Sequence, residues 1–231
     1  MHIPDGLING GTSLAGGGIA AGGIVVSLKQ AARTLDDRRI PMAGLAAAFI
    51  FAVQMLNFPV ASGTSGHLLG GVLAAVLVGP WTGALCVSVV LLVQGLLFAD
   101  GGLSALGLNT INMAFIGAFV GYGIFAAIRA VLPKTRSSVI VASGIAAALA
   151  PVLAACMFTL EYAIGGNGAA SVGRVAAAMI SVHVLIGIGE GVITAMTVSA
   201  VLASRPDLVH GAAHLPPFIR PAADSPEPAR G

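Results

Sequence analysis

Long apolar stretches are the feature that most constrains this chain. Stretches of membrane-spanning length lie at about residues 7–28, 40–57, 68–99, 103–132, 139–164 and 175–203. Of 231 residues, 57% are hydrophobic and only 9% are charged, and the mean hydropathy is +0.96. Because about a quarter of the residues in a soluble domain are charged, we predict an all-α integral membrane protein.

The stretch at 68–99 allows two interpretations. At about 1.5 Å per residue, one helix of this length would be far longer than a hydrocarbon core of ~30 Å. The segment "VGPW" interrupts it at Gly79 and Pro80. It is therefore either one tilted helix or two short ones.

Basic residues distinguish these two possibilities, because Lys and Arg are enriched in cytoplasmic loops. If the stretch forms two helices and the N-terminus is outside, only Arg174 of the 11 basic residues is external. The cytoplasmic ones are then Lys29, Arg33, Arg38, Arg39, Arg129, Lys134, Arg136, Arg205, Arg220 and Arg230. A single helix would move the groups at 129–136 and 205–230 outside. We therefore predict about seven transmembrane helices, an external N-terminus and a cytoplasmic C-terminus.

This topology defines the domain organisation. Residues 1–204 are predicted to form one membrane-embedded, metal-binding domain. Residues 205–231 are rich in proline and alanine and are predicted to be a disordered cytoplasmic tail. The N-terminus lacks the positive region and cleavage site of a signal peptide, so we expect it to remain in the working protein.

Several function classes lack support in the sequence. The net charge of +2 comes mostly from loops, which gives no support to a nucleic-acid partner. Walker A, HExxH and GxSxG sequences are absent, so the sequence shows none of these signatures of ATP hydrolysis, zinc proteolysis or serine hydrolysis. We predict that the chain is not an enzyme.

The first two residues carry an unusual set of potential metal ligands. The α-amine of Met1, the deprotonated amide nitrogen of His2 and the His2 Nδ1 can close adjacent five- and six-membered chelate rings on one ion. A fourth nitrogen would complete a plane typical of Ni(II) or Cu(II). Met1 must be retained and deformylated, and retention is expected because histidine is a large second residue. The alternative is a chance polar residue at a frayed chain end.

His67 is the candidate for the fourth nitrogen. It lies in "GTSGHLLGG", at the start of a predicted span, and the predicted topology places it on the same side as Met1 and His2. Its glycine neighbours would allow close backbone approach. A single histidine at a helix start is otherwise usually a capping or hydrogen-bonded residue.

Polar residues in or beside apolar stretches form a second group of candidates. Glu190 follows His183 by seven residues, which places both on one helix face, and we interpret Glu190 as the one acidic residue deep within the membrane. These residues either orient the ligands and hold the N-terminal segment or make ordinary interhelical hydrogen bonds. The candidates are Asp5, Thr64, Ser65, Asp100, Asn109, Asn112, His183 and Glu190.

Four stretches carry a family resemblance. These are "MHIPDG", "GTSGHLLGG", "QGLLFADGGLSALGLNTINMA" and "IGEGVIT". Over nearly the whole chain before the tail, the sequence resembles the substrate-binding component of energy-coupling factor importers for nickel and cobalt, the NikM/CbiM family. The cobalt branch begins more like "MHIMEG", with a cysteine and prolines around the equivalent histidine. With Pro4, Asp5 and "SGHLLGG", this chain looks closer to the nickel branch.

The resemblance implies a function and partners. It implies a multi-pass protein of a prokaryotic cell membrane that captures Ni²⁺, or Co²⁺ as second choice, as transported substrate, without a resident cofactor. Met1, His2 and His67 would be the ligands. A transmembrane coupling subunit and two cytoplasmic ATPase subunits would complete the importer, with a small accessory membrane subunit as a further candidate.

Two other functions remain as alternatives. A secondary metal permease working alone would usually carry several acidic residues in discontinuous helices, whereas Glu190 is the one interpreted here as intramembrane. A membrane-embedded enzyme would need an open coordination position and a nearby acid or base. Genes for a coupling protein and an ATPase beside this one would distinguish the importer from the permease.

Overall fold

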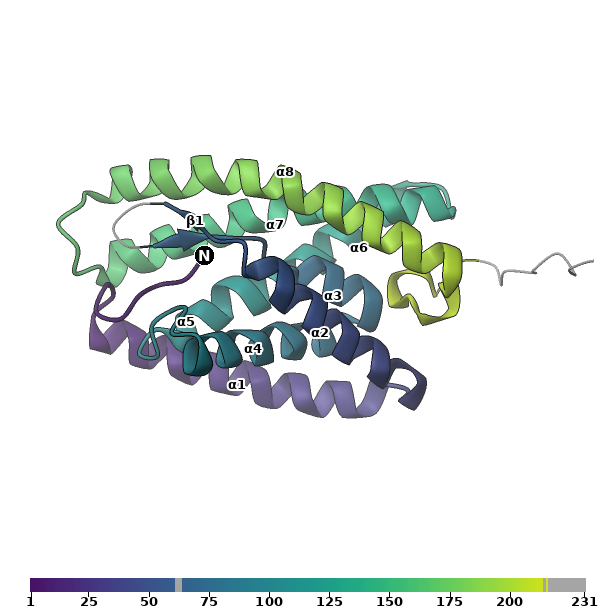
Figure 1. The fold of residues 1–231 in the computed structure, drawn as a ribbon, viewed down its shortest axis with the longest axis horizontal. Coiled ribbons are helices and arrows are strands. Elements are labelled where there is room, and N and C mark those ends of the chain that lie inside the picture. The colour runs from purple at the N-terminus through teal and green to yellow at the C-terminus, as the bar shows by residue number, and fades with distance from the viewer. Residues whose placement is uncertain (61–63, 214, 216–231) are drawn as a thin grey trace, which may run out of the picture.

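The computed structural model describes residues 1–60, 64–213 and 215 and shows a bundle of helices (Figure 1). The α-helices are α1 (Gly10–Thr34), α2 (Ile40–Gln54), α3 (Gly71–Val78), α4 (Pro80–Leu97), α5 (Leu106–Asn109), α6 (Gly121–Val131), α7 (Arg136–Gly165) and α8 (Val172–Ser204). A π-helical segment, η2 (Thr110–Val120), joins α5 to α6. The strands β1 (Phe58–Pro59) and β2 (Ser65–Gly66) form one short antiparallel pair.

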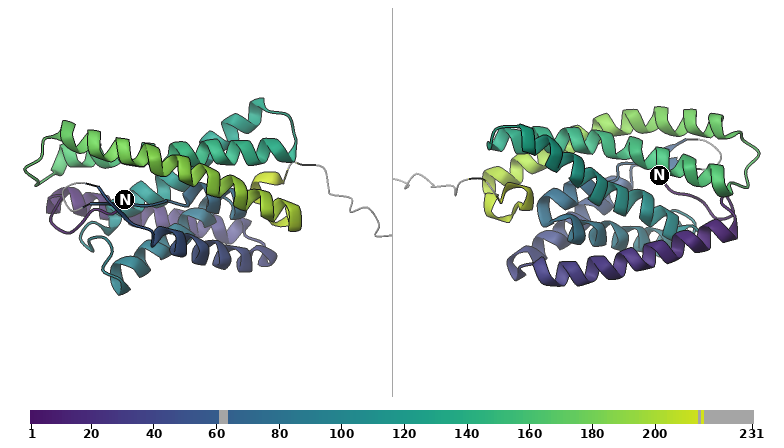
Figure 2. Two further views of the ribbon diagram at one scale, coloured as in Figure 1. Left: turned by 45° about the horizontal axis from the view of Figure 1, so that its top comes forward. Right: turned by 180° about the vertical axis from the view of Figure 1, so that it is seen from behind.

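The helices run along the long axis of the molecule. In Figure 1, α7 and α8 follow one edge, α1 follows the opposite edge, and α2 to α6 lie between them. The views in Figure 2 agree that the N-terminus lies inside the bundle near one end, while the last described residues lie at the other end. The first residues of the chain are therefore enclosed by helices.

Five helical elements of the described chain are long and apolar enough to cross a membrane. They are α1, α4, the continuous element Leu106–Val131, α7 and α8. Large apolar side chains such as Leu14 (80% exposed) and Leu185 (70% exposed) point away from the bundle, as expected for contact with lipid. The prediction of an all-α membrane protein agrees with this architecture.

The two remaining helices, α2 and α3, are shorter. Helix α2 has 15 residues and α3 has eight, all of which are buried. The predicted break in the stretch at 68–99 is confirmed, because α3 ends before Gly79 and α4 begins at Pro80. Gly79 has φ +91°, a conformation that favours glycine, and Pro80 occupies the first turn of α4, where no amide hydrogen is needed.

The start of the predicted tail differs from expectation. Residues 205–213 form ordered structure that includes the 3-10 turns η3 (Pro206–Leu208) and η4 (His210–Ala212). Val209 is 1% exposed and belongs to the main hydrophobic core, so burial of apolar side chains holds this segment on the bundle. The rest of the predicted tail, apart from residue 215, lies outside the described residues.

The contact between α7 and α8 gives a test of the packing. A Cβ added at Gly187 of α8 would overlap the carbonyl oxygen of Ala148 on α7, whereas one added at Gly189 would meet nothing within 4 Å. We expect Gly187→Ala to lower the thermal unfolding midpoint in detergent, because overpacking costs about 1–3 kcal/mol. The matched variant Gly189→Ala should leave the midpoint unchanged or raise it. Equal midpoints measured by circular dichroism would contradict this packing.

Candidate metal centre

The N-terminal segment enters the bundle before α1 begins. Met1 and Ile3 are fully buried and His2 is 4% exposed. The Ile3 amide donates to Asn109 Oδ1 at 2.8 Å, and the Gly102 amide donates to the Ile3 carbonyl at 2.8 Å. The loop between α4 and α5, together with the end of α5, thereby supplies the hydrogen bonds that this non-helical segment lacks.

Two further contacts fasten this segment. Asp5 Oδ1 accepts hydrogen bonds from the amide of Ser104 at 2.8 Å and from its hydroxyl at 2.5 Å. These bonds lower the pKa of Asp5, which stays ionised. The Asn9 amide donates to the Gly165 carbonyl at 2.7 Å, and the Asn9 side chain caps α1 by accepting from the Thr12 amide. The segment is thus held at several points along its length.

His67 lies directly beside His2. It follows β2, is fully buried, and its ring centroid is 4.6 Å from that of His2. The contact of His67 Nδ1 with the Leu68 carbonyl at 2.7 Å requires a hydrogen on Nδ1, because a carbonyl only accepts. The lone pair therefore lies on Nε2, which is buried and has no hydrogen-bond partner.

The nitrogens of this centre are kept neutral by burial. Burial lowers the pKa of the Met1 amine well below its usual value and lowers that of His2 to about 2. Burial also lowers the pKa of His67, with smaller contributions from the Met1 amine and His2. Uncharged nitrogens carry lone pairs, which is the protonation state that metal coordination requires.

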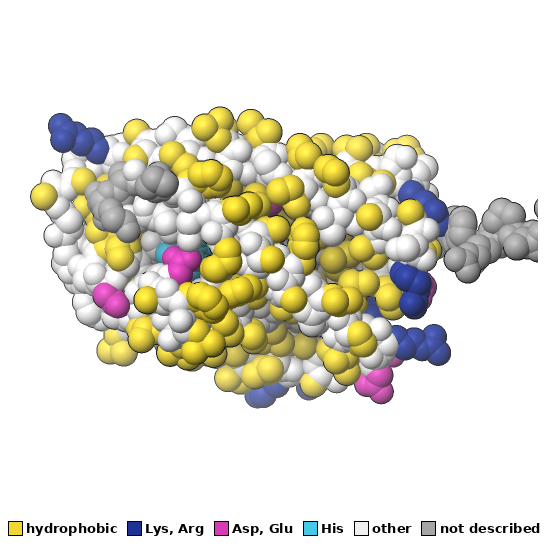
Figure 3. Space-filling view, in the orientation of Figure 1, with side chains coloured by type: hydrophobic (Ala, Val, Ile, Leu, Met, Phe, Trp, Pro, Cys, Tyr) yellow, Lys and Arg dark blue, Asp and Glu magenta, His cyan; other side chains and the backbone are white. Residues whose placement is uncertain are grey.

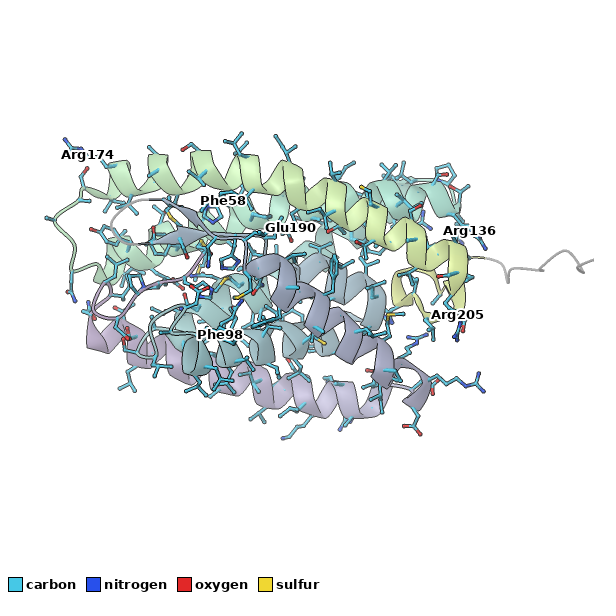
Figure 4. The ribbon with its side chains drawn as sticks, viewed as in Figure 1. Phe58, Phe98, Arg136, Arg174, Glu190 and Arg205 are labelled. Atoms are coloured by element: carbon cyan, nitrogen blue, oxygen red, sulfur yellow. The ribbon has the colours of Figure 1, made fainter. Side chains whose placement is uncertain are left out.

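Glu190 and Gln54 hold the loop that carries His67. The Glu190 carboxylate of α8 accepts from the amides of Leu69 at 2.6 Å and Gly70 at 2.9 Å. Gln54 Nε2 of α2 donates to the Leu69 carbonyl at 2.6 Å. Figure 4 shows Glu190 in the interior of the bundle. Two helices therefore fix the backbone immediately after His67, and Gln54 was not among the residues predicted from sequence.

Asp100 lies on the other side of His2. Its Oδ2 is 3.5 Å from His2 Nε2 and accepts a hydrogen bond from Asn57 Nδ2 at 2.8 Å. The next residue, Gly101, has φ +92°, and an added Cβ there would lie 2.6 Å from His2 Nδ1. The loop between α4 and α5 thus wraps closely around the imidazole.

The other predicted residues divide between the centre and its surroundings. Ser65 lines the same hollow as His2, and Thr64 Oγ1 donates to Met179 Sδ at 3.7 Å. His183 donates from Nδ1 to the Met179 carbonyl at 2.7 Å, which leaves its buried Nε2 without a hydrogen-bond partner, and its ring packs against Gly66. Asn112 Nδ2 donates to Glu161 Oε2 at 2.7 Å.

Glu161 corrects the interpretation that Glu190 alone is acidic within the membrane. Glu161 is 3% exposed and lies in α7, four residues before the helix ends at Gly165. The N-terminal segment packs against this end of α7 through the Ile8–Gly166 bridge. A position near the end of an apolar stretch gave no sequence signal for this burial.

The centre offers nitrogen donors rather than a cluster of acidic or thiol side chains. In the described part of the chain, no three His, Cys, Asp or Glu side chains come together around one point. The imidazoles of His2 and His67 lie together. The amine of Met1 and the amide of His2 belong to the same buried segment. Nitrogen donors of this kind are typical ligands of transition-metal ions.

A family model agrees with this chemistry. The model described as "Cobalt uptake substrate-specific transmembrane region" matches residues 2–208. The chain belongs to this family. It is accordingly a multi-pass protein of a prokaryotic cell membrane, from a family of nickel and cobalt transport proteins.

Individual relatives are named for both metals. A chain of Archaeoglobus fulgidus that carries the name of a fused nickel transport protein is 41% identical over 90% of this chain and 68% of its own length. A cobalt transport protein of Sorangium cellulosum is 32% identical over 90% of this chain and 94% of its own length. The crystal structure of a truncated transition metal transporter is 31% identical, with a TM-score of 0.81 over 88% of this chain and 99% of that one.

The loop held by Glu190 gives a second test. We expect Glu190→Gln to weaken metal binding by about 10- to 100-fold, because an amide cannot accept from both Leu69 and Gly70 and loosens the backbone beside His67. Glu161→Gln is the matched control, since that carboxylate binds Asn112 and not the His67 loop. Calorimetric titration with Ni²⁺ measures both, and equal affinities for the two variants would contradict the role of Glu190.

Proposed function

We propose that this chain is the substrate-capture subunit of an ATP-driven energy-coupling factor importer for transition-metal ions. It binds the ion through the Met1 amine, the amide and Nδ1 of His2, and His67. The observation that carries the proposal is the contact between the buried rings of His2 and His67, next in the chain to a Met1 that is itself fully buried.

The proposed topology has seven passes and an external N-terminus. Gly79, between α3 and α4, lies close to His210, whose Nδ1 is 3.4 Å from Arg39 Nη1. Helix α3 leads from the His67 loop toward this opposite end, which supports counting α3 together with its flanking loop as one of the proposed passes. Figure 4 places Arg136 and Arg205 at that opposite end and Arg174 at the end with the N-terminus. This distribution supports the proposal that the end with Arg136 and Arg205 is cytoplasmic.

Nickel is the first choice of ion and cobalt the second. A plane of four nitrogens that includes a deprotonated amide suits Ni(II). The opening "MHIPDG" and the segment "SGHLLGG" resemble the nickel branch. A relative named for nickel transport is 41% identical, against 32% for one named for cobalt transport.

The proposed partners are a transmembrane coupling subunit and two cytoplasmic ATPase subunits, with a small accessory membrane subunit as a further candidate. The coupling subunit and the ATPases would reshape the bundle so that the N-terminal segment loosens. Three of the four nitrogens belong to this segment, so its movement would break three metal bonds together.

The terminal chelate has a direct test. One extra residue before Met1 moves the amine out of register with the His2 amide, and we expect it to abolish tight Ni²⁺ binding. We expect His67→Ala to weaken binding strongly, whereas His210→Ala, at the other end of the bundle, should not. Metal content and calorimetric titration of the purified proteins measure this. Unchanged binding in the extended protein would exclude the chelate.

One observation from the fold supports the alternative, a secondary permease that works alone. Glu161 is a second buried carboxylate, and it lies next to the π-helical segment η2. The importer predicts that Ni²⁺ uptake into vesicles depends on ATP and on the partner subunits. Uptake by this chain alone, driven by an ion gradient and lost in Glu161→Gln, would favour the permease.

A further inference from the structure

The end of the bundle that holds the N-terminus carries very few exposed charges. Its loops contain Asp5 and Asp100, and Arg174 lies in the first turn of α8. Both acids line one hollow of about 350 Å³, while Arg174 lies at a distant corner of this end (Figure 4). The negative charge of this end is therefore concentrated at one place.

The buried side chain of His2, a proposed metal ligand, lines this hollow. His2 contributes to its wall. Neither its Nδ1, the proposed ligand, nor its Nε2 has a hydrogen-bond partner, and Asp100 Oδ2 lies 3.5 Å from Nε2. Figure 3 shows a small area of histidine at this surface, directly beside an acidic side chain. The hollow thus reaches from the surface to His2, one of the proposed ligands.

The two acids are held in different ways. One oxygen of Asp5 is engaged by Ser104, and these bonds keep the carboxylate ionised. Asp100 lies between His2 and Asn57, and its side chain is 19% exposed. Its negative charge also acts on the buried Met1 amine. Asp100 therefore connects the solvent side of the hollow to the nitrogen donors.

Oxygen and nitrogen donors suit different stages of capture. Carboxylates and hydroxyls bind hydrated divalent ions while the ions retain several waters. Imidazole and amide nitrogens bind Ni(II) and Co(II) more tightly but must first displace those waters. A cleft of one charge sign also raises the local concentration of oppositely charged ions and their association rate, by about 10- to 1,000-fold.

We infer that the hollow lined by Asp5, Ser65 and Asp100 is an encounter site for the hydrated divalent cation. The ion docks there by its charge and then passes to the nitrogens of Met1, His2 and His67. This inference rests on the proposed function, because it assumes that the ion reaches those nitrogens. It assigns Asp5 and Asp100 mainly to the rate of capture rather than to the final affinity.

The test is the association rate of aqueous Ni²⁺ with the purified full chain, measured by stopped flow at several ionic strengths. We expect Asp100→Asn to slow association about tenfold at low salt and to flatten its salt dependence. Asp5→Asn should slow it less, and Asp100→Glu should restore it. In Asp100→Asn the dissociation rate should change by a smaller factor than the association rate. Asp37→Asn removes the same charge at the opposite end and should have no effect.

The outcomes separate this inference from the proposed function. Faster dissociation with unchanged association in Asp100→Asn would mean that Asp100 only orients His2, which would overturn the encounter site. If Asp37→Asn slowed association as much as Asp100→Asn does, the effect would reflect the net charge of the whole protein. That result would also overturn the encounter site. Tight binding that survives an extra residue before Met1 would instead overturn the terminal chelate.

Discussion

Burial of the chain's first residues inside a membrane bundle is the constraint on which the rest of this structure depends. A segment without helix or strand leaves its amide and carbonyl groups unpaired, and unpaired groups away from water cost several kcal/mol each. Here loops pair them: Asn109 and Gly102 bind Ile3, and the Asn167 amide donates to the Leu7 carbonyl at 2.9 Å. The loops at this end are therefore shaped by the N-terminal segment.

The donor set is divided between two separately supported parts. The N-terminal segment is held by the loop between α4 and α5, where a Cβ added at Gly102 would overlap Asp5 and Pro4. The His67 loop is held by Glu190 of α8 and Gln54 of α2. Because different helices hold the two parts, a small relative movement of those helices would separate His67 from the nitrogens of the N-terminal segment. This division fits a subunit that must both bind an ion tightly and release it.

Sequence predicted the parts of this arrangement that depend on local pattern. The break at Gly79–Pro80 follows from the conformations open to these two residues, and the apolar stretches give the helices. The proximity of His2 and His67 followed from topology. The 4.6 Å distance between their ring centroids depends on loop geometry that no local pattern encodes. Gln54 was missed for a similar reason: its partner is a backbone carbonyl that only the folded loop brings to it.

The two buried carboxylates show why a polar residue in an apolar stretch does not define its own role. Glu190 uses both oxygens on backbone amides, whereas Glu161 uses one on Asn112 and its other oxygen has no hydrogen-bond partner. A buried carboxylate is costly unless a positive charge or several donors compensate it. The negative charge of Glu190 also acts on the buried Met1 amine. In the proposed chelate, a divalent cation bound to one deprotonated amide would keep a single positive charge, and the Glu190 carboxylate would partly offset it. The same residue that fixes the His67 loop would thus lower the electrostatic cost of binding a divalent ion inside the bundle.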